Sequence, residues 1–379
     1  MKKIVIVVGT RPNFIKITQF EKEFNKYPGQ FDYKLIHTGQ HYDDNMSKLF
    51  FEQFQLKKPD VFLNMQGKNP SEQIGQIIIK LSEYFSEWKP DLVVVVGDVN
   101  STLAAAIAAN KTHTPLAHLE SGLRSHDRGM PEEHNRVMTD AISDLLFVTE
   151  QSGLDTLKKD REDHSGIHFV GNTMIDTLVA FEDDIQASPI LEKLAVKKGE
   201  YALMTMHRPS NVDHKDGLEK MLQVIEHITD RGTLVFPIHP RTMKSLEKYD
   251  LDQQLKENKK VILTPPLDYL AFQKLIANSS FVITDSGGIQ EETTFRQVPC
   301  LTLRENTERP STIEIGSNML MPFDIEKIHA VITSIFDGTY KKGQVPPKWD
   351  GQATERIVKI LLEKKKEVSN SEVSDYHTS

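Results

Sequence analysis

The chain has 379 residues, a net charge of −8 and one cysteine, and these properties exclude several classes of protein. The length exceeds one ordinary hydrophobic core and suits two domains of roughly 170 to 200 residues each. A net negative charge argues against a general nucleic-acid or membrane-surface binder. The single cysteine, Cys300, excludes an internal disulfide and fits a reducing compartment, so we expect a cytoplasmic protein. No apolar run approaches the ~20 residues that span a membrane.

Short apolar runs alternate with longer amphipathic segments along the chain. The first half predicts strands at residues 4–8, 33–37, 91–96, 115–119 and 145–149, and helices at 12–27, 45–54, 71–88 and 101–110. The pattern restarts after residue 170, with strands at 201–206, 233–238, 261–263, 281–284 and 298–303, and helices at 217–229, 269–277 and 290–295. This alternation indicates parallel sheets with helices on both faces. We therefore predict an α/β fold of two doubly wound domains, residues 1–170 and 171–363, followed by a disordered tail at 364–379.

A glycine-containing turn follows the predicted strand at 281–284. Ser286, Gly287 and Gly288 lie between this strand and a helix, where free backbone N–H groups and the helix dipole can hold a phosphate. The glycines let the backbone approach a ligand closely. Glu292, one turn into the helix, can reach a ribose hydroxyl. The alternative is a glycine turn that only lets helix and strand pack closely.

Two cations follow the first predicted strand. Arg11 and Lys16 can bind a diphosphate, the arginine as a planar fork and the lysine as a point charge. The alternative is a surface lysine and an arginine paired with an acid elsewhere. We favour the diphosphate because ligands of doubly wound sheets bind at the carboxyl ends of the strands.

Carboxylates from three successive segments are the candidates for acid–base chemistry. Asp98 and Glu120 directly follow apolar strands, and Glu132 and Glu133 open a helix after Pro131. Buried together, such groups can act as general acid and base with raised pKa values. Acids at the start of a helix also stabilise it without any chemistry. A metal is a further alternative, but no His or Cys lies at a metal-like spacing, so we predict no metal.

Histidines near strand ends leave two interpretations open. His207 ends a strand of the second domain, where it can carry a proton, bind a phosphate or pack as a structural histidine. His37, Gln40 and His41 follow the second strand, and the sequence does not separate ligand contacts from loop packing there.

Ten short motifs occur here in an order and spacing that resembles the non-hydrolysing UDP-N-acetylglucosamine 2-epimerases. They are GTRPNFIK at 9–16, GQHYDDNM at 39–46, GDVNST at 97–102, HLESGLRS at 118–125, MPEEHNR at 130–136, GNTMIDT at 171–177, MHRPSN at 206–211, PIHPR at 237–241, DSGGIQEE at 285–292 and RENTERP at 304–310. Each motif is weak alone, but together they are specific and cover roughly residues 4 to 365.

The resemblance implies a GT-B-like fold of two Rossmann-like domains, with the active site in the cleft between them. A last helix usually packs back on the first domain. Members of the family interconvert UDP-GlcNAc and UDP-ManNAc, usually as homodimers, and use no nicotinamide cofactor and no obligatory metal. The implied mechanism eliminates UDP in the anti sense to give 2-acetamidoglucal and then adds UDP back. For this chain the resemblance thus implies a UDP-sugar substrate, a homodimer and no cofactor.

Matching motifs also imply roles for individual residues. The catalytic set is Asp98, Glu120, Glu132 and His207, and which carboxylate removes the C2 proton stays open. The substrate-binding set is Arg11, Lys16, Arg136, His239, Phe272, Ser286, Gly287, Gly288, Glu292 and Arg309. Gln40 and His41 match a pair through which some members bind a second UDP-GlcNAc as an activator. Asp43 stands where those members use another Gln.

Departures from the family pattern limit what the resemblance implies. Val99-Asn100-Ser101-Thr102 favours the non-hydrolysing branch, because hydrolysing relatives typically carry Arg and an acid at this place. Met206 replaces a glycine that often precedes the His-Arg pair. Some relatives epimerise UDP-linked diacetamido-uronic acids, so the sugar stays open. Two rival hypotheses are a GT-B glycosyltransferase, which needs an acceptor, and a catalytically silent nucleotide-sugar sensor.

Overall fold

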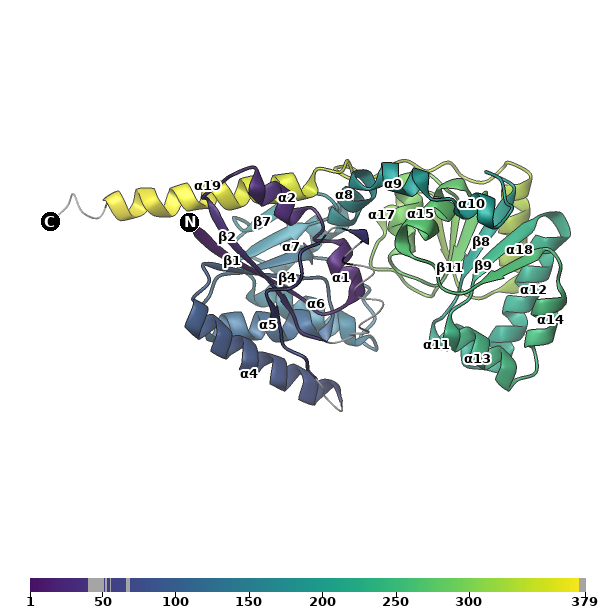
Figure 1. Cartoon of the computed structure of the whole chain (residues 1–379), viewed down its shortest axis with the longest axis horizontal. Helices are drawn as coiled ribbons and strands as arrows, with labels where there is room; N and C mark the ends of the chain where they lie inside the picture. Colours follow the sequence, from purple (N-terminus) through teal and green to yellow (C-terminus); the bar gives the residue numbers. More distant parts are fainter. Residues whose placement is uncertain (40–50, 52, 55, 66–68, 375–379) are drawn as a thin grey trace. The chain divides into compact units, whose positions relative to one another are not determined.

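The computed structural model describes residues 1–39, 51, 53–54, 56–65 and 69–374, with side chains as far as residue 363, and divides into two compact units (Figure 1). The first unit comprises residues 1–180 and the chain from Pro347 onward, and the second comprises Phe181–Pro346. The sequence predicts the boundary at residue 171 instead. The difference arises because α8 (Thr173–Ala180) packs into the first unit, where the Thr177 hydroxyl donates to Ile15 O at 2.5 Å.

A parallel sheet, with seven strands among the described residues, forms the centre of the first unit. The strand order is β3-β2-β1-β4-β5-β6-β7. All five residues of β4, Leu-Val-Val-Val-Val, are buried, as expected for a strand covered on both faces. The strands are β1 (Lys2–Val8), β2 (Phe31–His37), β3 (Val61–Phe62), β4 (Leu92–Val96), β5 (Leu116–Ser121), β6 (Leu145–Val148) and β7 (Ile167–Phe169).

Helices cover both faces of this sheet (Figure 1). On one face α4, α5 and α6 lie side by side, and α2 and α19 lie on the other. The alanines of α5 have small side chains, which lets the helix pack closely against α4, α6 and the sheet. Among the described residues, the helices of this unit besides α8 are α1 (Arg11–Ile15), α2 (Phe20–Asn25), α4 (Pro70–Trp88), α5 (Asn100–Lys111), α6 (Pro131–Ile142), α7 (Gln151–Asp160) and α19 (Ala353–Ser374).

The helix predicted at 12–27 is wrong in its continuity, because the chain forms two short helices, α1 and α2. Residues 16–19 form a turn between them. The turn leaves Lys16 as the C-cap of α1 with its side chain buried. The amphipathic spacing of residues 12–27 therefore did not reveal the turn at which the charged side chain of Lys16 is buried. The predicted helix at 45–54 lies largely outside the described residues.

The second unit repeats the architecture with a parallel sheet, of six strands among the residues described, ordered β10-β9-β8-β11-β12-β13. Its strands are β8 (Tyr201–Thr205), β9 (Thr233–Pro237), β10 (Val261–Thr264), β11 (Phe281–Thr284), β12 (Cys300–Leu303) and β13 (Asn318–Met321). Its helices are α9 (Glu182–Ala187), α10 (Ile190–Lys193), α11 (Pro209–Val212), α12 (Lys215–Arg231), α13 (Pro240–Lys248), α14 (Asp252–Glu257), α15 (Tyr269–Asn278), α16 (Ile289–Arg296), α17 (Ser311–Glu314) and α18 (Ile325–Phe336). Two hydrophobic clusters, one on each face of the sheet, form the core.

Residues after the second unit return to the first. There α19 packs against α2 and α8, and the Trp349 indole N–H donates to Thr149 O at 3.0 Å. Asp176 of α8 caps the start of α19, accepting from Ala353 N at 3.0 Å, Thr354 N at 2.6 Å and the Thr354 hydroxyl at 2.7 Å. The helix continues to Ser374, whereas the sequence predicts disorder from residue 364. The Lys and Glu residues at 363–367 are good helix formers, which accounts for the difference.

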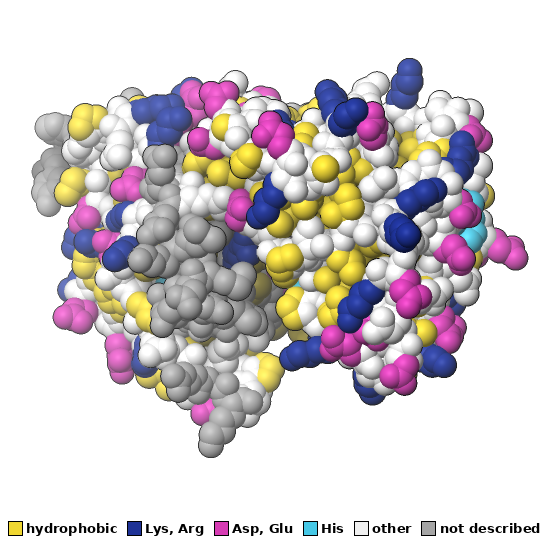
Figure 2. Space-filling view, turned by 45° about the vertical axis from the view of Figure 1, so that its right-hand side comes forward, with side chains coloured by type: hydrophobic (Ala, Val, Ile, Leu, Met, Phe, Trp, Pro, Cys, Tyr) yellow, Lys and Arg dark blue, Asp and Glu magenta, His cyan; other side chains and the backbone are white. Residues whose placement is uncertain are grey.

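Charged side chains of both signs are interspersed on the face shown in Figure 2. In the part of the chain that the structure describes, no helix combines the length and apolarity needed to cross a bilayer.

Replacing Asp176 by Ala should lower the free energy of unfolding by about 2 kcal/mol, because the capped N–H groups of α19 lose their buried acceptor. Urea denaturation measures the change. The control is Asp155→Ala, which removes an exposed carboxylate of α7 and should stay within about 0.5 kcal/mol of the wild type. Equal effects of the two substitutions would contradict the capping role.

Candidate functional site

In the first unit, Asn13 ties the end of β1 to the end of β4. Its Oδ1 accepts from Gly9 N at 3.1 Å and Thr10 N at 3.2 Å, and its Nδ2 donates to Val96 O at 3.2 Å. Arg11, at the first position of α1, is exposed. The site prediction omitted Asn13, although its place three residues after Thr10 matches a capping-box pattern.

Lys16 and Glu120 form a buried ion pair through Nζ and Oε2. The pair lies beside Gly97, where an added Cβ would come within 3.4 Å of both Lys16 Nζ and Asn13 Nδ2, and within 3.3 Å of Glu120 Oε2. A side chain at residue 97 would therefore press on the pair, and its φ of +68° also favours glycine. The structure thus brings together a predicted phosphate ligand and a predicted catalytic carboxylate.

Glu120 has an unusual backbone conformation. Its φ is +75°, in the left-handed region that non-glycine residues rarely adopt. The pairing of β5 with β6 shifts register between Leu119 and Ser121, which marks Glu120 as a bulge. Such conformations are costly by about 1–3 kcal/mol and collect at functional sites, where a bulge directs a side chain.

Arg136 joins two carboxylates at the start of α6. Its Nη2 lies 2.6 Å from Asp98 Oδ2 and its Nη1 lies 2.9 Å from Glu133 Oε2. Asp98 keeps 30% of its side chain exposed, whereas Arg136 and Glu133 are buried. Asp98 is therefore the member of this group that a ligand can reach.

Glu133 makes the contact with Arg136, although Glu132 is the glutamate that was assigned to the catalytic set. Burial raises the pKa of Glu133, but hydrogen bonds from Ser125 and His126 and the charge of Arg136 outweigh it and hold the pKa below its ordinary value. Glu133 thus stays ionised as a structural partner, and Glu132 is half-buried in the same helical turn. The spacing of Glu133 and Arg136, three residues apart on a helix, was a signal in the sequence for this pairing.

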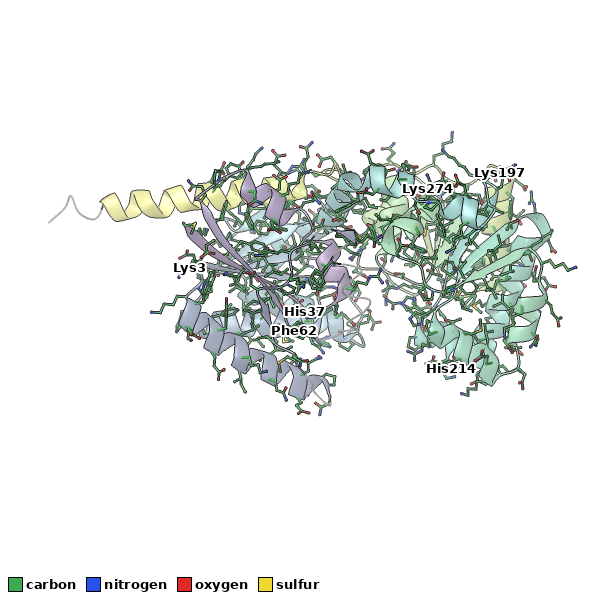
Figure 3. The ribbon with its side chains drawn as sticks, viewed as in Figure 1. Lys3, His37, Phe62, Lys197, His214 and Lys274 are labelled. Carbon is green, nitrogen blue, oxygen red and sulfur yellow. The ribbon has the colours of Figure 1, made fainter. Side chains whose placement is uncertain are left out.

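His37 is a packing residue, so for this histidine the structure favours loop packing over the ligand contact that the sequence left open. It ends β2, and its ring stacks between Phe14 and Phe62, with both centroid distances 5.1 Å (Figure 3). Its Nδ1 accepts from Gly39 N at 2.7 Å. Burial lowers the pKa of His37 to about 4, so the ring is neutral at physiological pH. The predicted activator residues Gln40 and His41, with Asp43, lie outside the described residues.

In the second unit, Asp285 organises the loop after β8. Fully buried at the end of β11, it accepts from His207 N at 3.0 Å, Arg208 N at 2.8 Å and Asn211 Nδ2 at 3.2 Å. Burial raises the pKa of Asp285, but its bonds to His207 and Arg208 outweigh this and hold the pKa below the ordinary value. Asp285 was not among the predicted site residues, yet it fixes the backbone of His207, which was.

The two predicted histidines of this unit lie next to each other. His207 Nδ1 is 3.0 Å from Asp285 Oδ1, while 42% of its side chain remains exposed. The ring centroid of His239 is 5.5 Å from that of His207. Burial and the neighbouring His207 lower the pKa of His239. One ring of the pair is therefore anchored and solvent-accessible, as a proton carrier or phosphate ligand must be.

The predicted phosphate turn is present, with Ser286, Gly287 and Gly288 half-buried between β11 and α16. A Cβ at Gly287 would lie 3.1 Å from Glu308 Oε1 and 3.3 Å from Arg304 Nη1. Glycine therefore allows these two side chains to approach the turn.

Buried guanidinium groups gather beside this turn. Glu308 lies 3.3 Å from both Arg304 Nη2 and Arg309 Nη1, and Arg309 Nε lies 2.8 Å from Glu291 Oε2. Burial, with the repulsion of Arg208 and Arg309, lowers the pKa of Arg304. Arg208, Arg304 and Arg309 thus place three guanidinium groups next to the turn, together with the carboxylates of Asp285, Glu291 and Glu308. Guanidinium groups fixed in this way suit a phosphate or diphosphate. Arg208 was not among the predicted site residues.

Glu292, the predicted ribose ligand, is buried in α16. Burial raises its pKa to about 7, the neighbouring Glu291 adds to the shift, and a hydrogen bond with Gln273 opposes it. Phe272, adjacent to Gln273 on α15, is partly buried against the core. The carboxyl group therefore titrates near neutral pH.

A cavity of about 640 Å³ lies elsewhere in the first unit, lined by residues that include Arg124, Val137, Met138 and Lys159. Its lining includes Glu133, one of the candidate carboxylates, but none of the residues assigned to the catalytic and substrate-binding sets. Across the described residues, no group of three or more His, Cys, Asp or Glu side chains is arranged to hold a metal ion.

The fold defines a class: a GT-B-like α/β protein of two Rossmann-like domains, with a glycine turn between β11 and α16 of the second. The sequence model of UDP-N-acetylglucosamine 2-epimerase matches residues 22–362. The UDP-N-acetylglucosamine 2-epimerase of Methanocaldococcus jannaschii is 39% identical over 365 residues, covering 95% of this chain and 98% of that protein. The chain belongs to the UDP-N-acetylglucosamine 2-epimerase family and is an epimerase, a kind of isomerase. The predicted resemblance and fold class are confirmed.

A solved structure of the same enzyme and one further relative are also similar to this chain. The solved structure of the Methanocaldococcus jannaschii enzyme in complex with UDP-GlcNAc and UDP has a TM-score of 0.84 and 39% identity, covering 95% of this chain and 99% of that chain. The UDP-2,3-diacetamido-2,3-dideoxy-D-glucuronate 2-epimerase of Pseudomonas aeruginosa is 35% identical over 363 residues, covering 95% of this chain and 99% of that protein.

Replacing Glu292 by Gln should flatten the pH dependence of stability. With a folded pKa of about 7 against an ordinary 4.5, folded Glu292 holds a proton that the unfolded chain releases. The free energy of unfolding therefore falls as pH rises from 4.5 to 7 and levels off above. Glu292→Gln should reduce the change between pH 5 and pH 8 by about 2–3 kcal/mol in urea denaturation.

The matched control for this titration is Glu257→Gln, at an exposed position of α14. It should keep the pH dependence of the wild type. If the Glu292 variant also follows the wild-type curve, Glu292 does not titrate near neutral pH.

Proposed function

We propose that this enzyme reversibly epimerises UDP-GlcNAc to UDP-ManNAc at C2 and releases no free sugar in the process. The observation that carries the proposal is the group of three arginines, Arg208, Arg304 and Arg309, beside the glycine turn of residues 286–288. An epimerase that detaches UDP and re-adds it must hold the diphosphate throughout, and such a turn supplies fixed cations and N–H groups for this task. The relative solved with both UDP-GlcNAc and UDP supports it.

The chemistry requires elimination before proton transfer becomes easy, because the C2 proton of the sugar is not acidic. Breaking the bond from C1 to the β-phosphate oxygen sends its electron pair to UDP and leaves an oxocarbenium-like centre. A carboxylate then takes the C2 proton, and the double bond between C1 and C2 gives 2-acetamidoglucal. Protonation of C2 on the opposite face and attack of UDP on C1 complete the epimerisation.

Residue roles follow from charge and exposure. In the second unit, Ser286, Gly287, Arg309 and His207 bind the phosphates, His239 assists, and Gly288 with Phe272 lines the nucleotide site. Glu292 binds the ribose in this scheme. In the first unit, Asp98 and Glu120 supply the acid and base, with Glu132 beside them. Lys16 pairs with Glu120 and Arg136 pairs with Asp98, and Lys16 with Arg11 also contacts the diphosphate.

The proposal extends to the location, assembly and pathway of the enzyme. The enzyme would act in the cytoplasm as a homodimer, without a cofactor, and its product would enter cell-envelope polysaccharide synthesis. The cleft between the two domains also stays a prediction, as does activation through Gln40 and His41. The relative that acts on a diacetamido-glucuronate makes such a UDP-sugar the second candidate substrate.

Proton NMR of UDP-GlcNAc with the pure protein in D2O, without acceptor or added metal, tests the proposal. Deuterium entering at C2 together with UDP-ManNAc is the expected result. Free ManNAc and UDP as main products would overturn the non-hydrolysing assignment. Exchange only with UDP-2,3-diacetamido-2,3-dideoxy-D-glucuronate would transfer the proposal to that substrate, and turnover only with an acceptor would indicate a glycosyltransferase.

Asp98→Asn should lower kcat by at least about 10³-fold, because the amide cannot act as base or acid. The Kd for UDP should change less than about twofold, because Asp98 lies outside the arginine cluster that binds the diphosphate in this scheme. Isothermal titration and steady-state kinetics measure both quantities. A variant with normal kcat would remove Asp98 from the mechanism.

A further inference from the structure

Two buried residues that the mechanism does not use, His118 and Asp140, enclose the reactive end of β5. His118 has no solvent exposure and Asp140 has 3%. His118 Nδ1 lies 2.7 Å from Asp140 Oδ1, and His118 Nε2 donates to Gly97 O at 2.7 Å. The ring thus joins the carboxylate of Asp140 to the carbonyl group of Gly97.

Asp140 also holds the other side of the bulge. Its Oδ2 accepts from Gly122 N at 3.1 Å and from Arg124 Nη1 at 2.6 Å. One carboxylate thus fixes residues 118 and 122, which flank Glu120 at equal distances in the sequence. Burial raises the pKa of Asp140, but the bonds and charges of His118 and Arg124 outweigh this and keep it ionised.

The same contacts reach the other candidate catalytic group. Gly97, whose carbonyl His118 holds, directly precedes Asp98 and lies against the Lys16–Glu120 pair. Asp140 projects from the same buried face of α6 as Glu133 and Arg136, at spacings of three and four residues. Arg136 in turn contacts Asp98. One helix face therefore supports both carboxylates at once.

We propose that His118 and Asp140 are positioning residues that hold Glu120 in its left-handed conformation and fix the Gly97-Asp98 turn for the epimerisation. This inference rests on the proposed function for its kinetic consequence. Neither side chain needs to touch the sugar, because their hydrogen bonds hold the backbone from which both carboxylates project. A displacement of about 1 Å in such groups is enough to lower a rate by about 100-fold.

The test compares Asp140→Ala with Asp140→Asn. The alanine variant loses every acceptor and should lower kcat by about 100-fold, with KM and the Kd for UDP within twofold of the wild type. The asparagine variant should recover at least tenfold of that loss. Its Oδ1 can still accept from Gly122 N and Arg124, and its NH2 group lies within reach of His118 Nδ1. Equal kcat values for the two variants would overturn a role through hydrogen-bond geometry.

A matched control separates positioning from stability. Asp176→Ala removes another carboxylate with 3% exposure in the same unit, one that accepts three hydrogen bonds at the start of α19. It should lower the Tm yet leave kcat within twofold at a temperature well below both transitions. If Asp140→Ala lowers kcat no more than Asp176→Ala does, the proposal is wrong.

A second variant covers the case in which Asp140→Ala does not fold. His118→Asn places an amide nitrogen near the position of Nδ1, so it keeps the contact with Asp140 and loses the bond to Gly97 O. At unchanged Kd for UDP, kcat should fall at least tenfold. A value within twofold of the wild type would refute the positioning role.

A crystal structure separates this inference from the proposed function. If the wild type converts no UDP-sugar, the proposed function fails by itself. The network is then judged by the structure of Asp140→Ala, or of His118→Asn where the alanine variant does not fold. Departure of Glu120 from positive φ with loss of the Lys16 contact supports the inference, and an unchanged Glu120 overturns it.

Discussion

Buried carboxylates that accept several hydrogen bonds at once are the interaction on which both functional clusters depend. Asp285 fixes the loop after β8 to the end of β11, and Asp140 fixes the turn after β5. A buried ionised group is stable only when its lone pairs are satisfied. Each carboxylate therefore restricts the surrounding loops to a few conformations. This restriction also fixes the direction of the exposed side chains on those loops.

The charge balance differs between the two units. In the first, Lys16 faces Glu120 and Arg136 faces two carboxylates, so the cluster is close to neutral or slightly negative. In the second, three arginines lie with Asp285, Glu291 and Glu308 beside the glycine turn, so cations and carboxylates are equal in number. Carboxylates suit proton transfer, whereas guanidinium groups fixed beside a glycine turn suit a diphosphate. The carboxylates of the first unit and the arginines of the second thus match the division of labour in the proposed reaction.

Much of this fold could be predicted from the sequence, because the central strands are fully buried and therefore continuously apolar. The strand at 91–96 is the clearest example, since β4 is buried at every position. The short edge strands β3, β7 and β13 were not predicted, because two to four residues carry too little pattern. Helix α18 was missed as well, although its amphipathic spacing is present in the chain.

Candidate site residues could be predicted as far as strand ends and glycine turns reveal them. Asp98, Glu120, His207 and Ser286 all lie at such places. The side-chain partners of these residues could not be predicted. The Lys16–Glu120 contact joins residues 104 positions apart, and the hydrogen bond from Arg208 to Asp285 joins residues 77 positions apart. The left-handed conformation of Glu120 could not be predicted either, because glutamate normally avoids this conformation. Local patterns identify where chemistry collects, and long-range contacts decide which group stabilises which.

The return of the chain to its first unit has a consequence for synthesis on the ribosome. The second unit is continuous, residues 181–346, and can fold as soon as it emerges. The first unit must wait, because Trp349 and the start of α19 complete its surface around Thr149 and Asp176. Until those last residues are translated, a buried acceptor and an apolar face stay open on a nascent chain that is otherwise built. The unit that begins first is therefore the one that finishes last, and a nascent chain arrested near residue 346 should be a substrate for chaperones.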